Sequence, residues 1–278
     1  MIGSSSNQAL PRRDIFIWIS TILFLNFLLD IFTKYPELSV TAVLTDLAAI
    51  GIFQYIAWYA IFYLLLCSDA ALLSGRRDFV IGVMFCAAML VPTSRIIWVV
   101  ATGVAIYWYI FDLNDLKLRA AAIILGALSV QELWGHVFFN AIAYPLLCAE
   151  TAVVGSFLEI IKAGTVWQDN VITGPTGYGI VIFGDCSAFH NLSLAMLCWI
   201  TISKLRHQTW RKKDFGVASV IGLTMIILNI MRLCLMAWSL DLYRYWHDGA
   251  GSNIFAIGAS LLVLLASLYG SKSIEERA

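Results

Sequence analysis

Three short stretches in the second half of the chain contain the residue types that a thiol-dependent acyl transfer needs. Cys186 lies in FGDCSAFHNL, Arg232 lies in the apolar run ILNIMRLCLMAW, and His247 lies in YRYWHDGAG. A thiolate can attack a carbonyl carbon, an imidazole can accept and return the proton, and a guanidinium can stabilise the resulting oxyanion. Because the three residues are far apart in the sequence, this chemistry requires a fold that joins three segments.

The thiol needs a partner to react at neutral pH. An unperturbed cysteine has a pKa of about 8.5 and is mostly protonated at that pH. Asp185 or Ser187 could cap the helix that follows, which would place Cys186 in its first turn. The helix dipole there contributes about 0.3–1 kcal/mol, less than the roughly 1.4 kcal/mol of one pKa unit. We therefore expect His247 to act as general base and later as general acid.

Polar neighbours of these residues are predicted to support them. Asn229 precedes Arg232 by three residues and shares its helical face, so it could orient either Arg232 or a substrate. Asp248 directly follows His247 and is predicted to be a supporting residue of the site.

A second histidine competes with His247 for the role of base. His190 lies four residues after Cys186, so the two share one face of a helix. It could equally be a packing residue that is hydrogen-bonded to Asn229 or Asn191.

The other cysteines and polar pairs have simpler explanations. A buried cysteine usually packs as a small hydrophobic residue, and we expect this of Cys67, Cys86, Cys198 and Cys234. A disulfide between Cys148 and Cys186 is an alternative to a reactive thiol.

Glu132 and His136 form an i, i+4 pair that favours a structural hydrogen bond over a proton relay. The cysteines show no paired metal spacing and HExxH is absent from the sequence. No metal and no cofactor are predicted.

The composition indicates an all-α integral membrane protein. Hydrophobic residues make up 60% of the chain and charged residues only 13%, whereas soluble proteins have roughly 45–50% and 25%. Lys plus Arg and Asp plus Glu both number 18, so no nucleic-acid partner is expected. The polar start MIGSSSNQALPRRD predicts a cytosolic tail before a retained first span.

About eight apolar segments approach the roughly 20 residues that a spanning helix needs. They are 14–33, 46–67, 79–94, 96–111, 119–147, 187–203, 215–240 and 250–270. A tight turn through Pro92–Arg95 is expected to join the third and fourth, and the fifth is expected to bend onto the surface near Pro145. No repeat or second domain is evident, so residues 1–278 form one polytopic membrane domain.

The basic residues predict the orientation. With the N-terminus inside, 13 of the 18 Lys and Arg residues fall in the cytosol, and eight spans return the C-terminus there. The stretches 148–186 and 241–249 then lie on the outer face. Within the first of these, residues 149–163 predict an amphipathic surface helix, and TVWQDNVI and YGIVIF around a Gly/Pro turn predict a β-hairpin.

The motifs GDCSAF, Asn229-Ile-Met-Arg232 and His247-Asp248-Gly-Ala-Gly251 resemble, in order, those of the exosortase/archaeosortase family. The similarity covers about residues 140–270. It implies a membrane cysteine protease or transpeptidase with Cys186, Arg232 and His247 as catalytic residues, located in the bacterial inner membrane with its site facing the periplasm.

The implied partners are secreted proteins with a C-terminal signal, which consists of a short motif, an apolar span and a basic tail. Cleavage would leave an acyl-enzyme on Cys186 that passes to an amine or to water, in a protein surrounded by membrane lipids.

Two positions depart from the family pattern. Ala188 replaces a usual glycine, and the carboxylate of Asp185 precedes the cysteine where a small neutral residue is more common. The alternative function is a non-enzymatic transporter or assembly component for envelope polysaccharide, with the polar cluster binding a lipid-linked sugar. Exosortases also occur among exopolysaccharide genes, so gene surroundings do not separate the two functions.

Overall fold

The computed structural model of the protein describes residues 12–34, 52–68, 75–89, 94–111 and 115–275. In these ranges the chain is almost wholly helical, apart from one small sheet. The helices are α1 (Arg12–Lys34), α3 (Ile52–Leu66), α4 (Arg76–Met89), α5 (Ser94–Phe111), α6 (Leu116–Ser129), a π-helical turn (Val130–Trp134), α7 (Gly135–Ile161), α8 (Ala188–Arg206), α9 (Lys212–Trp238), α10 (Leu240–Tyr243), a second π-helical turn (Arg244–Asp248) and α11 (Ala250–Glu275).

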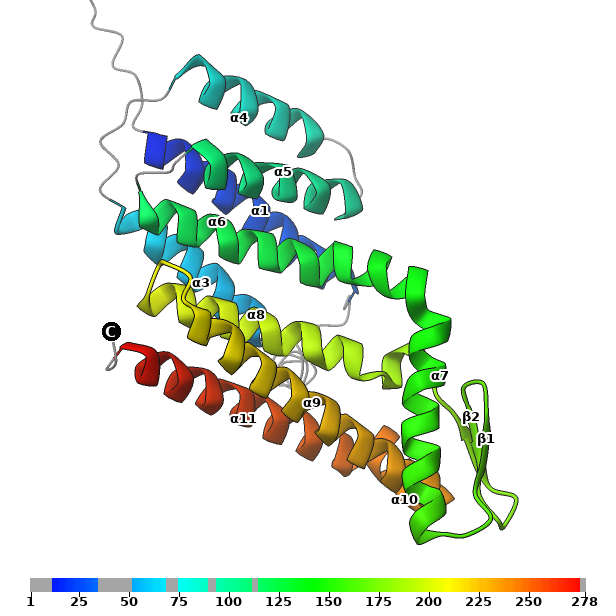
Figure 1. Cartoon of the computed structure of the whole chain (residues 1–278). Helices are drawn as coiled ribbons and strands as arrows, with labels where there is room; N and C mark the ends of the chain where they lie inside the picture. Colours follow the sequence, from blue (N-terminus) through cyan, green and yellow to red (C-terminus); the bar gives the residue numbers. More distant parts are fainter. Residues whose placement is uncertain (1–11, 35–51, 69–74, 90–93, 112–114, 276–278) are drawn as a thin grey trace, which may run out of the picture.

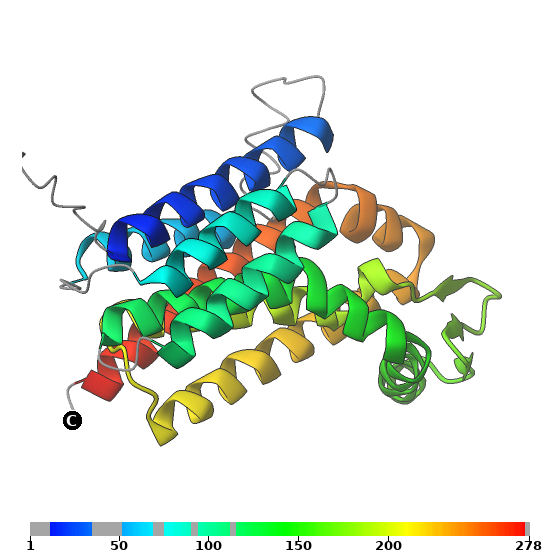
Figure 2. The same ribbon diagram turned by 90° about the horizontal axis from the view of Figure 1, so that it is seen from above.

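Most of the helices lie side by side in one bundle (Figures 1 and 2). α6 packs against α3, α5 and α8, and α8 packs in turn against α9 and α11. The indole rings of Trp58, Trp108 and Trp199 are fully buried between them. Many large apolar side chains on the outside are exposed, which suits helices whose outer faces contact lipid hydrocarbon.

Three helical segments are long and apolar enough to cross a membrane: Leu116–Ile161, Lys212–Trp238 and Ala250–Lys272. Ile52–Leu66 and Arg95–Phe111 are apolar but shorter. The 14 residues of α4 extend only about 21 Å, against a hydrocarbon core of about 30 Å. The structure thus supports a helical membrane protein without confirming the predicted count of eight spans. Residues 46–51 and Pro92–Thr93 of the prediction lie outside the described ranges.

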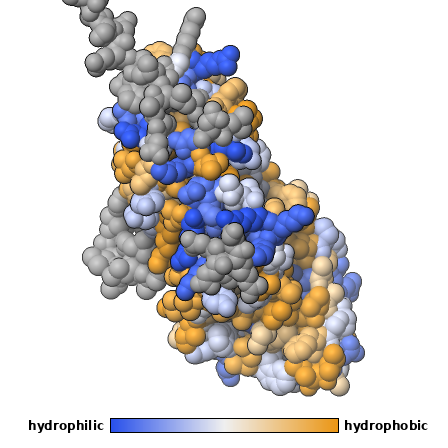
Figure 3. Space-filling model, turned by 60° about the vertical axis from the view of Figure 1, so that its left-hand side comes forward, coloured by the Kyte–Doolittle hydropathy of each residue, from blue (hydrophilic) through white to orange (hydrophobic). Residues whose placement is uncertain are grey.

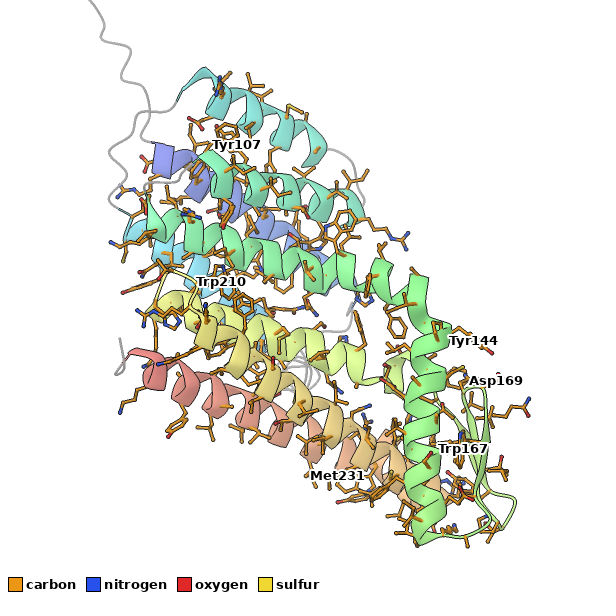
Figure 4. All side chains as sticks on the ribbon, viewed as in Figure 1. Tyr107, Tyr144, Trp167, Asp169, Trp210 and Met231 are labelled. Atoms are coloured by element: carbon orange, nitrogen blue, oxygen red, sulfur yellow. The ribbon has the colours of Figure 1, made fainter. Side chains whose placement is uncertain are left out.

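The fifth predicted span, 119–147, bends close to Pro145 as predicted (Figure 4), but the prediction of its end was wrong. The helix does not stop near Pro145 but continues from Leu116 to Ile161, with Pro145 inside it. It turns sharply away from the bundle (Figure 1), and Tyr144 lies close to the bend (Figure 4). Prolines and π-helical turns both bend helices without ending them, and this segment contains both. The predicted surface helix 149–163 is therefore the last part of α7.

The predicted hairpin is present, but the sheet has a third strand. The antiparallel strands β1 (Val166–Gln168), β2 (Val171–Thr173) and β3 (Gly179–Val181) lie in the order β1-β2-β3. The first β-rich run folds back on itself because Asp169 adopts a left-handed conformation with φ of 54°. Aspartate tolerates that conformation better than most residues do.

The sheet packs on α7, where Trp167 (labelled in Figure 4) lies against Gly155. A Cβ atom on Gly155 would lie 2.5 Å from the indole ring, so only glycine fits there. Tyr144 Oη also donates a hydrogen bond of 2.8 Å to Asp169 Oδ1 in the β1–β2 turn. These contacts fix the sheet on α7, and the sheet leads directly into the turn that carries Cys186.

The two predicted faces lie at opposite ends of the bundle. The start of α6, the α8–α9 connection and the end of α11 share one end, and the sheet and α10 lie at the other (Figures 1 and 2). Figure 3, in which the former end comes forward, shows hydrophilic side chains gathered there beside broad apolar areas.

Candidate functional site

Cys186 ends a short 3-10 turn, Gly184–Cys186, directly before α8. Ser187 is the N-cap of that helix, and its Oγ accepts a hydrogen bond of 3.2 Å from the backbone N–H of Phe189. Cys186 therefore precedes the N-cap residue. The prediction that it lies in the first turn of the helix was wrong. Asp185 does not cap the helix. Because dipole effects fall off within the first turn, helix α8 gives the thiol less support than expected.

The backbone of Cys186 is held by α9. Asn229 Nδ2 donates a hydrogen bond of 2.9 Å to the carbonyl oxygen of Cys186. Asn229 is buried, and its Oδ1 accepts from Asn191 Nδ2 at 3.5 Å. The sequence suggested that Asn229 orients Arg232 or a substrate, whereas its described contacts position the cysteine.

A residue that the sequence analysis missed holds the same turn from the other side. Glu150 Oε1, on α7, accepts hydrogen bonds from Ser187 Oγ at 2.8 Å and from the backbone N–H of Ala188 at 3.0 Å. The available signal was an acidic residue within an apolar helix, which usually marks a site. Assigning residues 149–163 to a surface helix gave its charge a simpler explanation.

Arg232 connects α9 to the segment that carries His247. Its Nε donates a hydrogen bond of 3.1 Å to the carbonyl oxygen of Trp246, and its guanidinium lies 5.0 Å from the ring centre of Phe255. In the described part of the chain its two terminal NH2 groups have no hydrogen-bond partner. Arg232 is also near enough to Cys186 for its charge to favour the thiolate. These donors are thus available to an oxygen atom near the thiol.

His247 lies in the second π-helical turn and is fixed on two sides. Its Nδ1 lies 2.6 Å from Asp248 Oδ1, and its ring stacks on Tyr243 at 4.8 Å between centres with 11° between planes. With Nδ1–H donated to the carboxylate, Nε2 is the basic nitrogen. Tyr243 is a second residue that the sequence analysis missed, although the spacing of four residues on one helical segment was a signal.

Tyr243 lies near the thiol as well as against the imidazole. Burial raises the pKa of its phenol, and the charges of Cys186 and Asp248 act in the same direction. One aromatic ring therefore lies within electrostatic range of Cys186 while it stacks on His247.

His190, the rival base, lines two cavities. One, of about 200 Å³, lies between α8, α9 and α11 and is also lined by Arg232. The other, of about 360 Å³, lies beside α7 and is lined by His136 and Asp185 as well. Within the described ranges no hydrogen bond joins the Cys186 thiol to His190 or to His247. The contacts of the thiol therefore do not decide whether His190 or His247 is the base.

The resting thiol is held in its protonated form. Burial raises the pKa of Cys186, a backbone hydrogen bond from Phe183 and the charge of Arg232 lower it, and the charges of Asp185 and Glu150 raise it again. The net shift is upward. Formation of a thiolate therefore requires proton transfer to a base.

Two alternatives from the sequence can be compared with the structure. Cys148 and Cys186 are both free, which contradicts a disulfide between them. Glu132 accepts a hydrogen bond from Gln54 Nε2 of α3, a contact between helices that agrees with the expected structural role, although Gln54 was not predicted as its partner. Among the described residues, no group of three or more His, Cys, Asp and Glu side chains is arranged to hold a metal ion.

A family model matches the chain over most of its length. The model of the transmembrane exosortase family, Exosortase_EpsH, matches residues 19–264. The family resemblance predicted from residues 140–270 is thereby confirmed, and the match extends through the N-terminal helices. No curated protein and no solved structure matches the chain.

Proposed function

Because the chain belongs to the transmembrane exosortase family, we propose that it is a membrane cysteine transpeptidase or protease that cleaves C-terminal sorting signals of secreted proteins. One observation carries the proposal: a continuous series of contacts joins the three motifs. Asn229 binds the backbone of Cys186, and Arg232 on the same helix binds the residue before His247.

The proposed reaction begins with transfer of the Cys186 proton to His247 Nε2. The thiolate attacks the scissile carbonyl carbon, and the terminal NH2 groups of Arg232 donate to the oxyanion. His247 returns the proton to the departing amine of the released tail, leaving a thioester. An acceptor amine or water then attacks this thioester, loses its proton to His247 and restores the thiol.

The proposed location is the bacterial inner membrane, with both termini in the cytosol and the site at the periplasmic face. The asymmetry of basic residues supports this orientation. The substrates would be secreted proteins whose signal combines a short motif, an apolar span and a basic tail. An apolar span would bring the scissile bond to the depth of the membrane surface, where the Cys186 turn would lie.

The orientation can be tested by labelling with a membrane-impermeant maleimide. We expect Thr176→Cys, in the exposed β2–β3 turn, to react from outside intact cells. Gln208→Cys, in the α8–α9 connection, should react only after the cells are opened. Labelling of the parent protein, which contains only the native cysteines, is measured as the background. Labelling of Gln208→Cys in intact cells would reverse the proposed layout.

The two histidines can be separated by substitution. His247→Ala should reduce processing by roughly 10²–10⁴-fold, the usual contribution of a general acid–base residue. His190→Ala should leave a substantial remainder, because His190 lines cavities within the bundle and lacks the fixed Asp248 and Tyr243 partners. Processing of a co-expressed substrate, normalised to membrane level, is the measurement. If His190 is indispensable and His247 is not, the role of base moves to His190.

A further inference from the structure

The backbone around Cys186 is held by two different helices. Asn229 of α9 binds the carbonyl oxygen of Cys186 at 2.9 Å. Glu150 of α7 binds the two residues that follow, through Ser187 Oγ at 2.8 Å and the Ala188 N–H at 3.0 Å. The direction of the cysteine side chain is therefore set between α7 and α9.

The contacts of Glu150 satisfy the exposed end of helix α8. The first N–H groups of a helix lack partners within the helix, and an anion near them is stabilised. Glu150 accepts from Ala188, while Ser187 Oγ accepts from Phe189 and donates to Glu150. The Glu150 carboxylate thus lies against the N-terminus of α8, directly after the Cys186 turn.

Capping of helix α8 does not explain why a glutamate is present at position 150. Ser187 already caps the helix with its own hydroxyl group. Glu150 is largely withdrawn from solvent, and its Oε2 is buried with no hydrogen-bond partner in the described part of the chain. Its charge also acts against ionisation of the nearby thiol. An unpaired buried oxygen and an unfavourable charge near the thiol both cost free energy. We therefore infer that Glu150 has a role at the Cys186 turn besides stabilising helix α8.

We propose that Glu150 is a positioning residue for the nucleophile, which fixes the Cys186 turn on α7 so that the thiol faces Arg232. The inference rests on the proposed function of Cys186. Asp185, Arg232 and Tyr243 are the other charged or titratable groups that act on the thiol. Glu150 differs from them because it bonds the backbone of the turn.

Two substitutions separate the hydrogen bonds of Glu150 from its charge. Glu150→Gln retains an oxygen that can accept from Ser187 and Ala188 but removes the charge. Glu150→Ala removes both. Glu159→Gln, at an exposed position of the same helix, is the matched control for the loss of one negative charge.

The first measurement is alkylation of Cys186 by iodoacetamide in the full-length protein, followed across pH by mass spectrometry of the Cys186 peptide. Glu150→Gln should move the profile to lower pH, because a negative neighbour of the thiol is gone, and Glu159→Gln should not. The second measurement is substrate processing at equal membrane level. Glu150→Gln should retain most of it, whereas Glu150→Ala should lose roughly 10²-fold, the scale expected when a reacting group is misplaced by about 1 Å.

Wild-type processing by Glu150→Ala would overturn the proposal, as would Glu150→Ala and Glu150→Gln alkylation profiles that coincide, because only the alanine variant loses the hydrogen bonds to the turn. If Glu150→Ala does not reach the membrane, processing by Glu150→Gln decides, because a loss of processing with the hydrogen bonds retained would overturn the proposal. Alkylation needs no substrate, so it reports on the turn even if Cys186 proves unnecessary for processing. That last result would remove the proposed function and leave the alkylation result standing.

Discussion

Replacing Cys186 with serine is expected to abolish substrate processing while leaving the amount of protein in the membrane unchanged. Serine is nearly the same size as cysteine, so the fold should change little, and the Cys234 variant described below measures the cost of a hydroxyl group in the same buried cluster. A hydroxyl group is far less acidic than a thiol, and the same weak base cannot make a comparable nucleophile of it. The measurement is the ratio of processed to unprocessed substrate in cells that produce each variant.

Cys234→Ser and Cys198→Ser are the matched controls. Cys234 belongs to the same buried cluster as Cys186, and Cys198 lies further along α8. Both variants should process substrate at close to the wild-type rate. Equal loss in the Cys186 and Cys234 variants would mean that packing of the cluster, and not a nucleophile, explains the effect.

Arg232→Lys should also fail, with a loss of roughly 10²–10³-fold in processing rate, the usual cost of removing one oxyanion donor. Nε of Arg232 donates to the carbonyl oxygen of Trp246, and the proposed mechanism assigns the terminal NH2 groups to a substrate oxygen. A lysine ammonium is a single point of charge and cannot reproduce this divided geometry. The rate of tail release from a purified substrate in detergent measures the effect.

Arg244→Lys is the control for this variant, because Arg244 is exposed and lies in the π-helical turn next to the site. Its processing should stay at the wild-type level. If Arg232→Lys were equally active, charge alone would suffice at this position, and the assignment of Arg232 to the oxyanion would fail.

Helix positions could be predicted where an apolar run of membrane length coincides with one straight helix. The predicted spans 14–33 and 250–270 differ from α1 and α11 by only a few residues at their ends. The bend near Pro145 was predicted, but hydrophobicity does not tell whether a helix that changes direction also ends, so the continuation of α7 to Ile161 was missed. The third strand depended on a left-handed residue at Asp169, a local preference that β-propensity does not register.

In the candidate site, residue type was sufficient to select the three motifs, but contacts between distant segments were not predictable. Glu150 was missed because it acts through Ser187, a partner that only the fold brings close. Tyr243 was missed because residues 241–249 were not predicted to be helical, so its spacing of four residues from His247 was not used. The position of Cys186 relative to α8 depended on whether Asp185 or Ser187 caps that helix. Both Asp185 and Ser187 are good capping residues, and the sequence alone does not choose between them.

The central claim is covalent catalysis by Cys186, and the most direct test is mass spectrometry of the protein after reaction with its substrate. We expect a thioester between the Cys186 peptide and the new C-terminus of the substrate. Hydroxylamine should remove it, and it should be absent from the Cys186→Ser variant. It should accumulate when acceptor amines are withheld. Wild-type processing by Cys186→Ser, with no adduct on any cysteine, would contradict covalent catalysis and leave envelope-polysaccharide assembly as the function to test.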